Sequence, residues 1–330
     1  MSSLTLPPGV RRWLRAARLS VDSEATSRIA SSRNLTLVAR SGGVLSLVKI
    51  AATVDDPFSA REIRLLGALD GGGAGFRTPR VTHAATGRFA IEWLPGVTAF
   101  DRRRRDRRVA VRDDAAIGHA LAHLHARSPL TTEAVSGDLI ARLLWLSPAE
   151  YASSSAASLT LWNAVQTNSR AELALRRLLT FEDAHPRVLC HGDLRQSNVL
   201  LHAGRVGFVD LELGGAGDPA RDLGMWMAED LGFFLVPRDR REQLTLTQLR
   251  VRLRAFQRAW EREAAVLKLP GRGGVRPRAM AWAAEALLRR TYTMTFHDGH
   301  WTEREAHVTA SALELLVAPG KWARHFLGTP

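Results

Sequence analysis

Short apolar runs separated by turn residues fill the first 95 positions, which is the pattern of β-strands rather than helices. Residues 28–50 predict three strands with short connections, and Gly42-Gly43 provides the hairpin turn between the last two. Two more strands follow before Pro95-Gly96, which is typical of a hinge. The four clearest strands are predicted over 35–40, 44–50, 80–84 and 88–94.

Two helices accompany these strands. Residues 57–69 have helical spacing, and 71–75 are predicted to form a glycine-rich loop. Residues 10–19, after Pro7-Pro8-Gly9, form a short basic amphipathic pattern. Such a helix can lie on a membrane surface, but we expect it to pack on the first lobe.

Apolar spacing becomes helical after the hinge. Thr302 and Glu305 form a capping box that opens the last segment, and we see no internal repeat. These patterns predict an α+β, bilobal fold, with an antiparallel-sheet N-lobe over 1–95 and a mostly helical C-lobe over 96–330. The helical segments are predicted over 115–127, 139–145, 171–179, 238–268, 276–296 and 302–326.

Composition supports a globular protein. The 330 residues are 45% hydrophobic, and no apolar run approaches the ~20 residues that span a membrane. Residues 1–20 carry scattered arginines, so we expect no signal peptide. Cys190 is the single cysteine and is expected to be buried, which fits a cytoplasmic protein without disulfides.

The net charge of +13 comes almost entirely from arginine, because only three of the 46 basic residues are lysines. The three lysines are Lys49, Lys268 and Lys321. Lys49 lies in an apolar strand, where an exposed lysine would be unusual. Each lysine is therefore informative in a chain with this bias.

The segment 188–210 contains the strongest chemical pattern. Asp193 is followed five residues later by Asn198 and twelve residues after that by Asp210. Between them, two apolar strands joined at 202–205 predict a hairpin that returns Asp210 to the same end as Asn198. Their oxygens suit Mg²⁺ bound to phosphates, Asp193 can take a proton from a hydroxyl, and Arg195 can reach a transferring phosphoryl group.

These motifs resemble the aminoglycoside phosphotransferase and choline-kinase-like family, with its protein-kinase-like fold, over residues 28–223. The resemblance implies that Asp193 is the catalytic base and that Asn198 and Asp210 bind Mg²⁺. It further implies ATP as the phosphoryl donor, although GTP stays open. The remaining roles that it implies are Lys49 on the α- and β-phosphates, Glu62 as its ion-pair partner, Glu92, Trp93 and Leu94 as the hinge at the adenine, and Asp222 as the acid that braces the catalytic loop.

The phosphate-covering loop is where the sequence departs from many kinases. Residues 30–34 have no glycine, so Ser31, Ser32 and Asn34 are the candidates to cap phosphates through hydroxyl and backbone groups. Leu211-Glu212 also replaces the phenylalanine–glycine pair of eukaryotic protein kinases after Asp210. This replacement favours the branch that acts on small molecules.

The acceptor is predicted to be a neutral or acidic molecule with a hydroxyl group. A chain of this charge repels polycationic aminoglycosides at long range, although local acids such as Glu229, Asp230 or Asp298 can oppose this effect. The setting we expect is bacterial secondary metabolism or antibiotic modification. No membrane and no specific nucleic acid are expected as partners.

Alternatives remain open at this point. A Ser/Thr kinase acting on a ribosomal precursor peptide before dehydration, of the lanthipeptide or thioamitide type, could hold an acidic leader with its arginines at 102–105 and 107–108. The same run could be an ordinary solvated face. A basic nucleic-acid-binding protein would explain the charge but not the Asp-Asn-Asp spacing, and a pseudokinase scaffold would predict a damaged set. His297 and His300 are read as part of a loop rather than a metal site.

Overall fold

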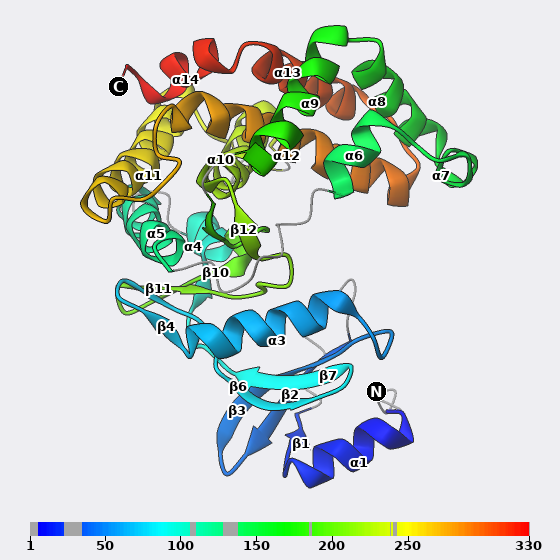
Figure 1. Cartoon of the computed structure of the whole chain (residues 1–330), viewed down its shortest axis with the longest axis vertical. Coiled ribbons are helices and arrows are strands. Elements are labelled where there is room, and N and C mark those ends of the chain that lie inside the picture. Colours follow the sequence, from blue (N-terminus) through cyan, green and yellow to red (C-terminus); the bar gives the residue numbers. More distant parts are fainter. Residues whose placement is uncertain are drawn as a thin grey trace.

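The computed structural model describes residues 6–22, 35–105, 110–127, 138–184, 187–237, 239 and 243–329. Antiparallel strands with two covering helices form one end of the molecule, and a larger body of helices forms the other (Figure 1). Short strands lie between the two parts. The α+β fold class predicted from the sequence is confirmed.

The first sheet has five antiparallel strands in the order β1-β2-β3-β7-β6. Gly42 and Gly43 make the predicted turn between β2 and β3, and both have positive φ. The edge strand β1 precedes the segment 28–50, where the sequence predicted three strands, and residues 28–34 of that segment lie outside the described part. The strands are β1 (Ser20–Val21), β2 (Leu35–Ser41), β3 (Val44–Ile50), β6 (Val81–Ala85) and β7 (Arg88–Glu92).

Helix α3 (Pro57–Leu69) has the bounds that the sequence predicted. Asp56 caps its first turn by accepting a hydrogen bond from Ser59 N at 2.8 Å, and Pro57 occupies a position where no backbone donor is needed. The helix ends at Asp70, which adopts the left-handed conformation. Its buried face carries Leu65, Leu66 and Leu69, and among them the carboxylate of Glu62.

Helix α1 (Pro8–Ala16) packs on the first sheet, as expected, and not as a free amphipathic helix. Its apolar residues Val10 and Leu14 lie in one buried cluster with Leu37 and Val48 of the sheet. Among the described residues, we find no helix with the length and apolarity needed to cross a membrane.

A second sheet joins the two parts of the molecule, with strand order β4-β5-β11-β10-β8. It includes Gly72 and Gly73, so the prediction of a loop over the whole of 71–75 was wrong: β4 pairs with β5 across Gly72↔Arg77. The strands are β4 (Gly72–Gly73), β5 (Phe76–Arg77), β8 (Val97–Thr98), β10 (Val199–His202) and β11 (Arg205–Phe208). A separate pair consists of β9 (Val188–Cys190) and β12 (Gly215–Gly217).

The helical part follows the predicted segments, but it differs from them at several places. The segment 302–326 is two helices, because Pro319 opens a new helix after Ala318. The helix predicted over 238–268 begins only at Leu246, and α7, α8 and α10 were not predicted. His297 belongs to helix α12, not to a loop. The helices are α4 (Ala99–Arg105), α5 (Ala110–His125), α6 (Asp138–Leu144), α7 (Pro148–Ser153), α8 (Ala156–Gln166), α9 (Ser169–Ala184), α10 (Pro219–Leu235), α11 (Leu246–Val266), α12 (Val275–Asp298), α13 (Glu303–Val317) and α14 (Pro319–Leu327).

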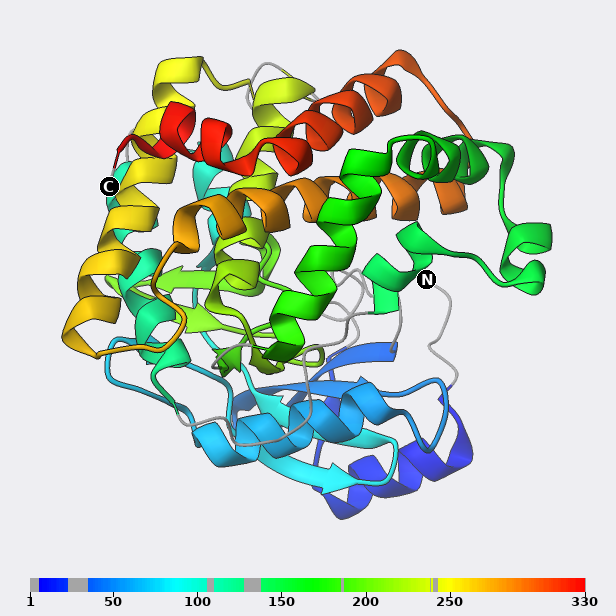
Figure 2. The same cartoon turned by 45° about the horizontal axis from the view of Figure 1, so that its top comes forward.

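Large aromatic side chains form the centre of the helical part. Trp226, Phe256, Trp260 and Trp282 are almost fully buried, and the rings of Trp226 and Phe256 stack with centroids 5.6 Å apart. Helix α12 crosses this layer and contacts α10, α13 and α14 (Figure 2). Cys190 is fully buried at the base of the catalytic segment, as predicted for a small apolar side chain.

Candidate active site

The hairpin of β10 and β11 brings Asn198 and Asp210 to the same end, as the spacing predicted. Val199 pairs with Phe208, so the residues that flank the hairpin lie next to each other. Val209 N donates to Asn198 O at 3.1 Å and extends this pairing to the edge of the site. Two residues that are twelve positions apart therefore face the same space.

Asp193 and Asn198 lie on one hydrogen-bonded loop. Asn198 Nδ2 donates to Asp193 O at 3.0 Å and to Asp193 Oδ2 at 3.1 Å. Arg195 Nη2 lies 2.7 Å from the same carboxylate oxygen. The Asp193 side chain is 14% exposed, and that of Arg195 is 53% exposed, so this carboxylate can meet a ligand from one side. Arg195 therefore pairs with Asp193, the base that the sequence predicts.

The buried Asp222 holds the backbone of this loop. Its two oxygens accept hydrogen bonds from His191 N at 2.7 Å and from Gly192 N at 3.0 Å. His125 Nε2 lies 3.0 Å from Asp222 Oδ2, and Trp260 Nε1 donates to His125 Nδ1 at 3.1 Å. Burial alone would raise the pKa of Asp222, but the hydrogen bond and charge of His125 and the backbone donors hold it below its usual value.

Gly192 turns the chain between His191 and Asp193, and no other residue fits there. Its φ is +81°, a region that L-residues rarely adopt. A Cβ added to Gly192 would lie 2.2 Å from the carbonyl oxygen of Leu213. The close approach of these two backbone segments sets the position of Asp193.

Lys49 joins three segments of the site. Its ammonium lies 2.8 and 2.7 Å from the two oxygens of Glu62 on α3 and 2.6 Å from Asp210 Oδ1. Lys49 is 7% exposed and Glu62 is fully buried. The predicted ion pair between Lys49 and Glu62 is therefore present, and Asp210 is a second partner that the sequence did not indicate.

The charges of these groups affect one another. Burial alone would lower the pKa of Lys49, but Glu62 and Asp210 raise it above its usual value. Burial raises the pKa of Glu62 to about 7, and the charge of Lys49 opposes that rise. Burial also acts to raise the pKa of Asp210, but Lys49 holds it below the usual value. Asp210 therefore stays ionised. Its backbone adopts the left-handed conformation, with φ of +66°.

The remaining predicted nucleotide-binding residues fall into two groups. Ser31, Ser32 and Asn34 lie outside the described residues. In the hinge, Glu92 Oε1 accepts from Arg77 at 3.0 Å, and Leu94 is 8% exposed. Trp93 N donates to Leu45 O at 3.2 Å, which ties the hinge to β3.

The donor set of the site fits Mg²⁺. Asn198 directs its amide nitrogen at Asp193, and its oxygen accepts a hydrogen bond from Ser197 Oγ at 3.3 Å and can still accept a second partner. Asp210 contributes an ionised carboxylate. Glu62, Asp210 and Glu212 also present carboxylate oxygens within 4.8 Å of one another. Hard oxygen donors of this kind suit a magnesium ion that also binds phosphate oxygens.

A buried ion network that was not predicted lies beneath the catalytic loop. Arg103 of α4 pairs with Asp114 of α5 and lies 2.8 Å from Asp230 of α10. Arg252 of α11 bonds to the same two acids at 3.2 and 2.8 Å. Gln196 of the catalytic loop donates to Asp230 at 2.9 Å, so the network supports the loop directly. Basic residues on separate helices carry no local spacing that would reveal such a cluster.

This network changes the interpretation of the arginine run. Arg103 is 7% exposed, Arg102 pairs with Asp113 at 3.1 Å, and Arg104 pairs with Asp239 at 2.9 Å. The four described arginines are therefore not one free basic face for an acidic leader. Arg107 and Arg108 lie outside the described residues.

Glu229 contacts the backbone of the catalytic loop. One of its oxygens accepts a hydrogen bond from Gln196 N, and the other lies 3.9 Å from Arg290. Burial raises the pKa of Glu229, although Gln196 and the nearby arginines oppose this rise. By contrast, Asp230, which the sequence suggested as a second acid for the acceptor, is 1% exposed and is taken up by the arginine network.

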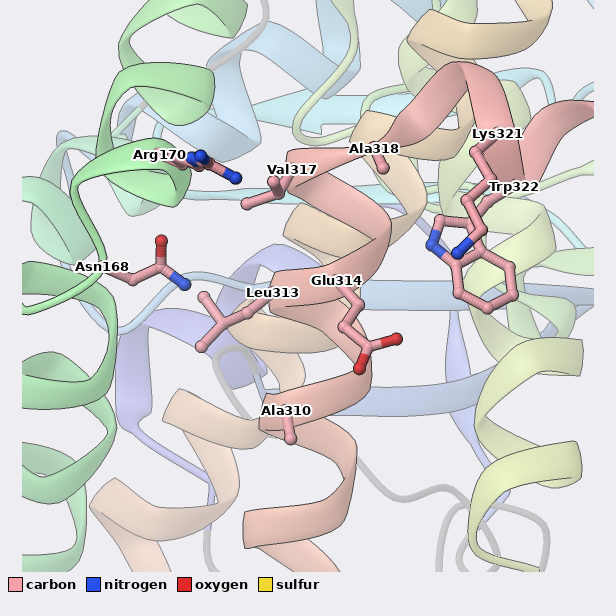
Figure 3. Close-up of a pocket in the computed structure, with 9 residues that line it drawn as sticks. All are labelled: Asn168, Arg170, Ala310, Leu313, Glu314, Val317, Ala318, Lys321 and Trp322. Carbon is pink, nitrogen blue, oxygen red and sulfur yellow. The ribbon is translucent and has the colours of Figure 1, made fainter.

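A separate cavity of about 570 Å³ lies between α9, α13 and α14 (Figure 3). Its lining combines Leu313 and Trp322 with the charged residues Arg170, Glu314 and Lys321. No residue to which the sequence assigned a catalytic or nucleotide-binding role lines it.

Comparisons with known proteins agree with this fold. A family model described as the phosphotransferase enzyme family matches residues 30–266. No curated protein matches the chain. Three similar solved structures are aminoglycoside phosphotransferases. A mutant of APH(4)-Ia with ADP and hygromycin B has 17% identity and a TM-score of 0.54, with 94% of this chain and 98% of that chain covered.

The other two structures show the same fold at still lower identity. ADP-bound APH(2'')-Ib has 13% identity and a TM-score of 0.54, covering 95% of this chain and 99% of that one. APH(2")-IIa with streptomycin and ATP has 12% identity and a TM-score of 0.54, with 88% of this chain and 91% of that chain covered. The resemblance inferred from the motifs is confirmed. The chain belongs to the phosphotransferase enzyme family and is an O-phosphotransferase of kinase-like fold.

Proposed function

We propose that this chain transfers the γ-phosphate of ATP, with Mg²⁺, to the hydroxyl group of a small molecule. The observation that carries the proposal is the contact of Lys49 with both Glu62 and Asp210. This contact places a compact cation between a helical carboxylate and a metal-binding candidate, next to the loop that carries Asp193. The same arrangement suits the phosphates of a nucleotide.

Each residue then has a role that follows from its position. Asp193 accepts the proton of the attacking hydroxyl, and Arg195 moves from Asp193 to the transferring phosphoryl group. Lys49 binds the α- and β-phosphates, and Glu62 holds it in place. Asn198 and Asp210 hold Mg²⁺, which neutralises charge on the phosphate oxygens when bound.

The hinge completes the nucleotide site in this proposal. The backbone of Glu92 and Leu94 meets the adenine edge, while Ser31, Ser32 and Asn34 cap the phosphates. The boundary between an N-lobe over 1–95 and a C-lobe over 96–330 falls at the same hinge. Closure of the two lobes would exclude water from the phosphoryl group.

We further propose a neutral or acidic acceptor. Arg195 and Arg290 flank Glu229 near the catalytic loop, so the local charge there is not dominated by carboxylates. The net charge of +13 also disfavours the approach of a polycation. The solved relatives bind aminoglycosides according to their descriptions, but at 12–17% identity they support the fold and not the acceptor.

A panel of acceptors tests this proposal. The purified chain is incubated with ATP and Mg²⁺ and with neutral, acidic and polycationic hydroxyl compounds, and ADP release and product mass are measured. We expect a phosphate mass shift with a neutral or acidic compound, and an Asn198→Ala variant should need at least tenfold more Mg²⁺. Efficient phosphorylation of an aminoglycoside would reject the acceptor class alone. Full activity of Asp210→Asn would reject the magnesium site and the proposed mechanism.

A further inference from the structure

Two histidines and a glutamate form a second polar cluster, on helices α5 and α11. His119 Nδ1 lies 3.1 Å from Glu263 Oε2, and His123 Nε2 lies 3.1 Å from Glu263 Oε1. The histidines are four residues apart, so they share one face of α5, and their ring centroids are 4.7 Å apart. One donor atom from each residue lies within 4.8 Å of the other two.

These separations are close to those of a zinc site. With metal–nitrogen and metal–oxygen bonds of about 2.1 Å, the ligands of a tetrahedral ion are about 3.4 Å apart. The two nitrogen–oxygen distances of 3.1 Å run to different oxygens of Glu263, and each is within a few tenths of an ångström of this value. Two neutral imidazoles and one carboxylate are ligands that Zn²⁺, Co²⁺ and Ni²⁺ accept.

The surroundings hold the cluster in place while leaving it accessible. A Cβ added to Gly75 would lie 2.9 Å from His123 Cδ2 and 3.4 Å from His119 Nε2, so the turn between β4 and β5 covers the rings closely. The side chains of His123 and Glu263 are 18% and 20% exposed, and that of His119 is 48% exposed. His119 also lines a cavity of about 800 Å³, which offers space for the remaining ligand of an ion.

Two of the nearby cations are paired with acids of their own. Three arginines, Arg77, Arg80 and Arg205, line the same cavity. Arg77 pairs with Glu92 at 3.0 Å and Arg80 pairs with Asp70 at 3.3 Å, so the charges of these two are already matched. Glu263 is the charged group in direct contact with both imidazoles. Without a metal, one proton on each ring would satisfy the cluster through two hydrogen bonds to Glu263.

We propose that His119, His123 and Glu263 form a binding site for one divalent transition-metal ion of the zinc class. The ion would link α5 to α11 beneath the β4–β5 turn. This site is separate from the residues assigned to Mg²⁺, which are a carboxylate and an amide on the catalytic hairpin. It does not depend on the proposed phosphoryl transfer.

Cobalt binding tests the site directly. The full chain, without a histidine tag and stripped of metal, is titrated with Co²⁺ in excess Mg²⁺, and the visible absorption of tetrahedral Co²⁺ is recorded. We expect one equivalent with strong absorption, which Zn²⁺ displaces. Zinc should also raise the melting temperature. The oxygen ligands at Asn198 and Asp210 would give only the weak spectrum of a six-coordinate ion.

Variants separate this cluster from other histidines. His123→Ala and Glu263→Gln should each weaken binding at least tenfold, and His119→Ala/His123→Ala should abolish the signal. The matched control is His83→Ala on β6, which should bind Co²⁺ with the same affinity as the unmodified chain. Circular dichroism checks that each variant is folded. One tetrahedral equivalent retained in the double variant, or none in the unmodified chain, would overturn the proposal.

Discussion

Lys49 Nζ lies 2.6 Å from Asp210 Oδ1, although the two residues are 161 positions apart in the chain. Lys49 belongs to the first sheet, and Asp210 follows the catalytic hairpin. Glu62, on α3, completes the contact. The geometry of the candidate phosphate site thus depends on how the two parts of the molecule meet, and several experiments can test this dependence.

Removal of the Lys49 charge should destabilise the fold. In Lys49→Met, Glu62 stays fully buried without its cation, and the free energy of unfolding should fall by about 3–5 kcal/mol. The double variant Lys49→Met/Glu62→Leu should recover much of this loss, because the fully buried carboxylate of Glu62 is removed and Asp210, with 31% of its side chain exposed, remains in contact with solvent. Urea denaturation measures the stability of both. Phosphoryl transfer should be lost in both variants, because neither has a lysine at position 49 to bind the phosphates.

Lys321→Met is the matched control for this pair, since Lys321 is exposed and its ammonium lies over the ring of Trp322 at 5.0 Å. It should change stability by less than about 0.5 kcal/mol. If Lys49→Met and Lys321→Met were equally stable, the buried ion pair would not contribute to folding as inferred.

Asp193→Asn should separate binding from chemistry. The amide keeps the shape of the side chain but cannot accept the hydroxyl proton, so kcat should fall by about 10²–10⁴-fold. Nucleotide affinity, measured by calorimetry, should change little, because Lys49 and Asp210 are untouched. Asp70→Asn is a suitable control, since Asp70 is exposed at the end of α3 in a conformation that asparagine tolerates. Unchanged turnover in Asp193→Asn would refute the assignment of the base.

Two glycines with similar backbone conformations provide a test of the catalytic turn. Gly192 has φ of +81° and Gly204 has φ of +75°, but only Gly192 faces a backbone atom within 4 Å. Gly204→Ala should cost about 1–2 kcal/mol from conformation alone. Gly192→Ala should cost more, because the Cβ forces Leu213 to move, and activity should be lost. Denaturation and ADP release measure the two effects, and equal losses in both variants would contradict the role of the contact.

The charge of Asp222 should contribute to stability in a pH-dependent way. Its pKa in the folded chain is depressed, so its contribution is present above the ordinary value of about 3.9 and is lost as the pH falls through the folded-state pKa. Asp222→Asn lacks this contribution at every pH. The difference in unfolding free energy between the two proteins should therefore shrink from pH 6 toward pH 2, as measured by urea denaturation. A constant difference would show that the charge is not responsible.

Arg103 should matter for folding although it belongs to a run of arginines. Arg103→Ala leaves Asp114 and Asp230 with Arg252 as their shared cation, and we expect a loss of about 3–5 kcal/mol. Arg105→Ala, at an exposed position of the same helix, should be close to neutral. Thermal denaturation compares the two. Similar melting temperatures would mean that the buried network is not needed for stability.

The sequence alone determined those features that depend on neighbouring residues. Pro57 and the capping acid Asp56 set the start of α3, and Gly42-Gly43 set the first hairpin turn. The spacing of Asn198 and Asp210 followed from the hairpin between them, because paired strands of that length return to their starting end. The motifs within residues 28–223 were enough to identify the family.

Only the tertiary structure decided which distant groups meet. It brought Asp210 to Lys49, buried Arg103 among acids from other helices, and placed Glu263 against His119. The sequence suggested an exposed basic face at Arg103, because an arginine beside other arginines carries no local sign of its partner. The physical reason is that local spacing fixes turns and helix faces, whereas the packing of helices and sheets sets the distances between side chains far apart in the chain.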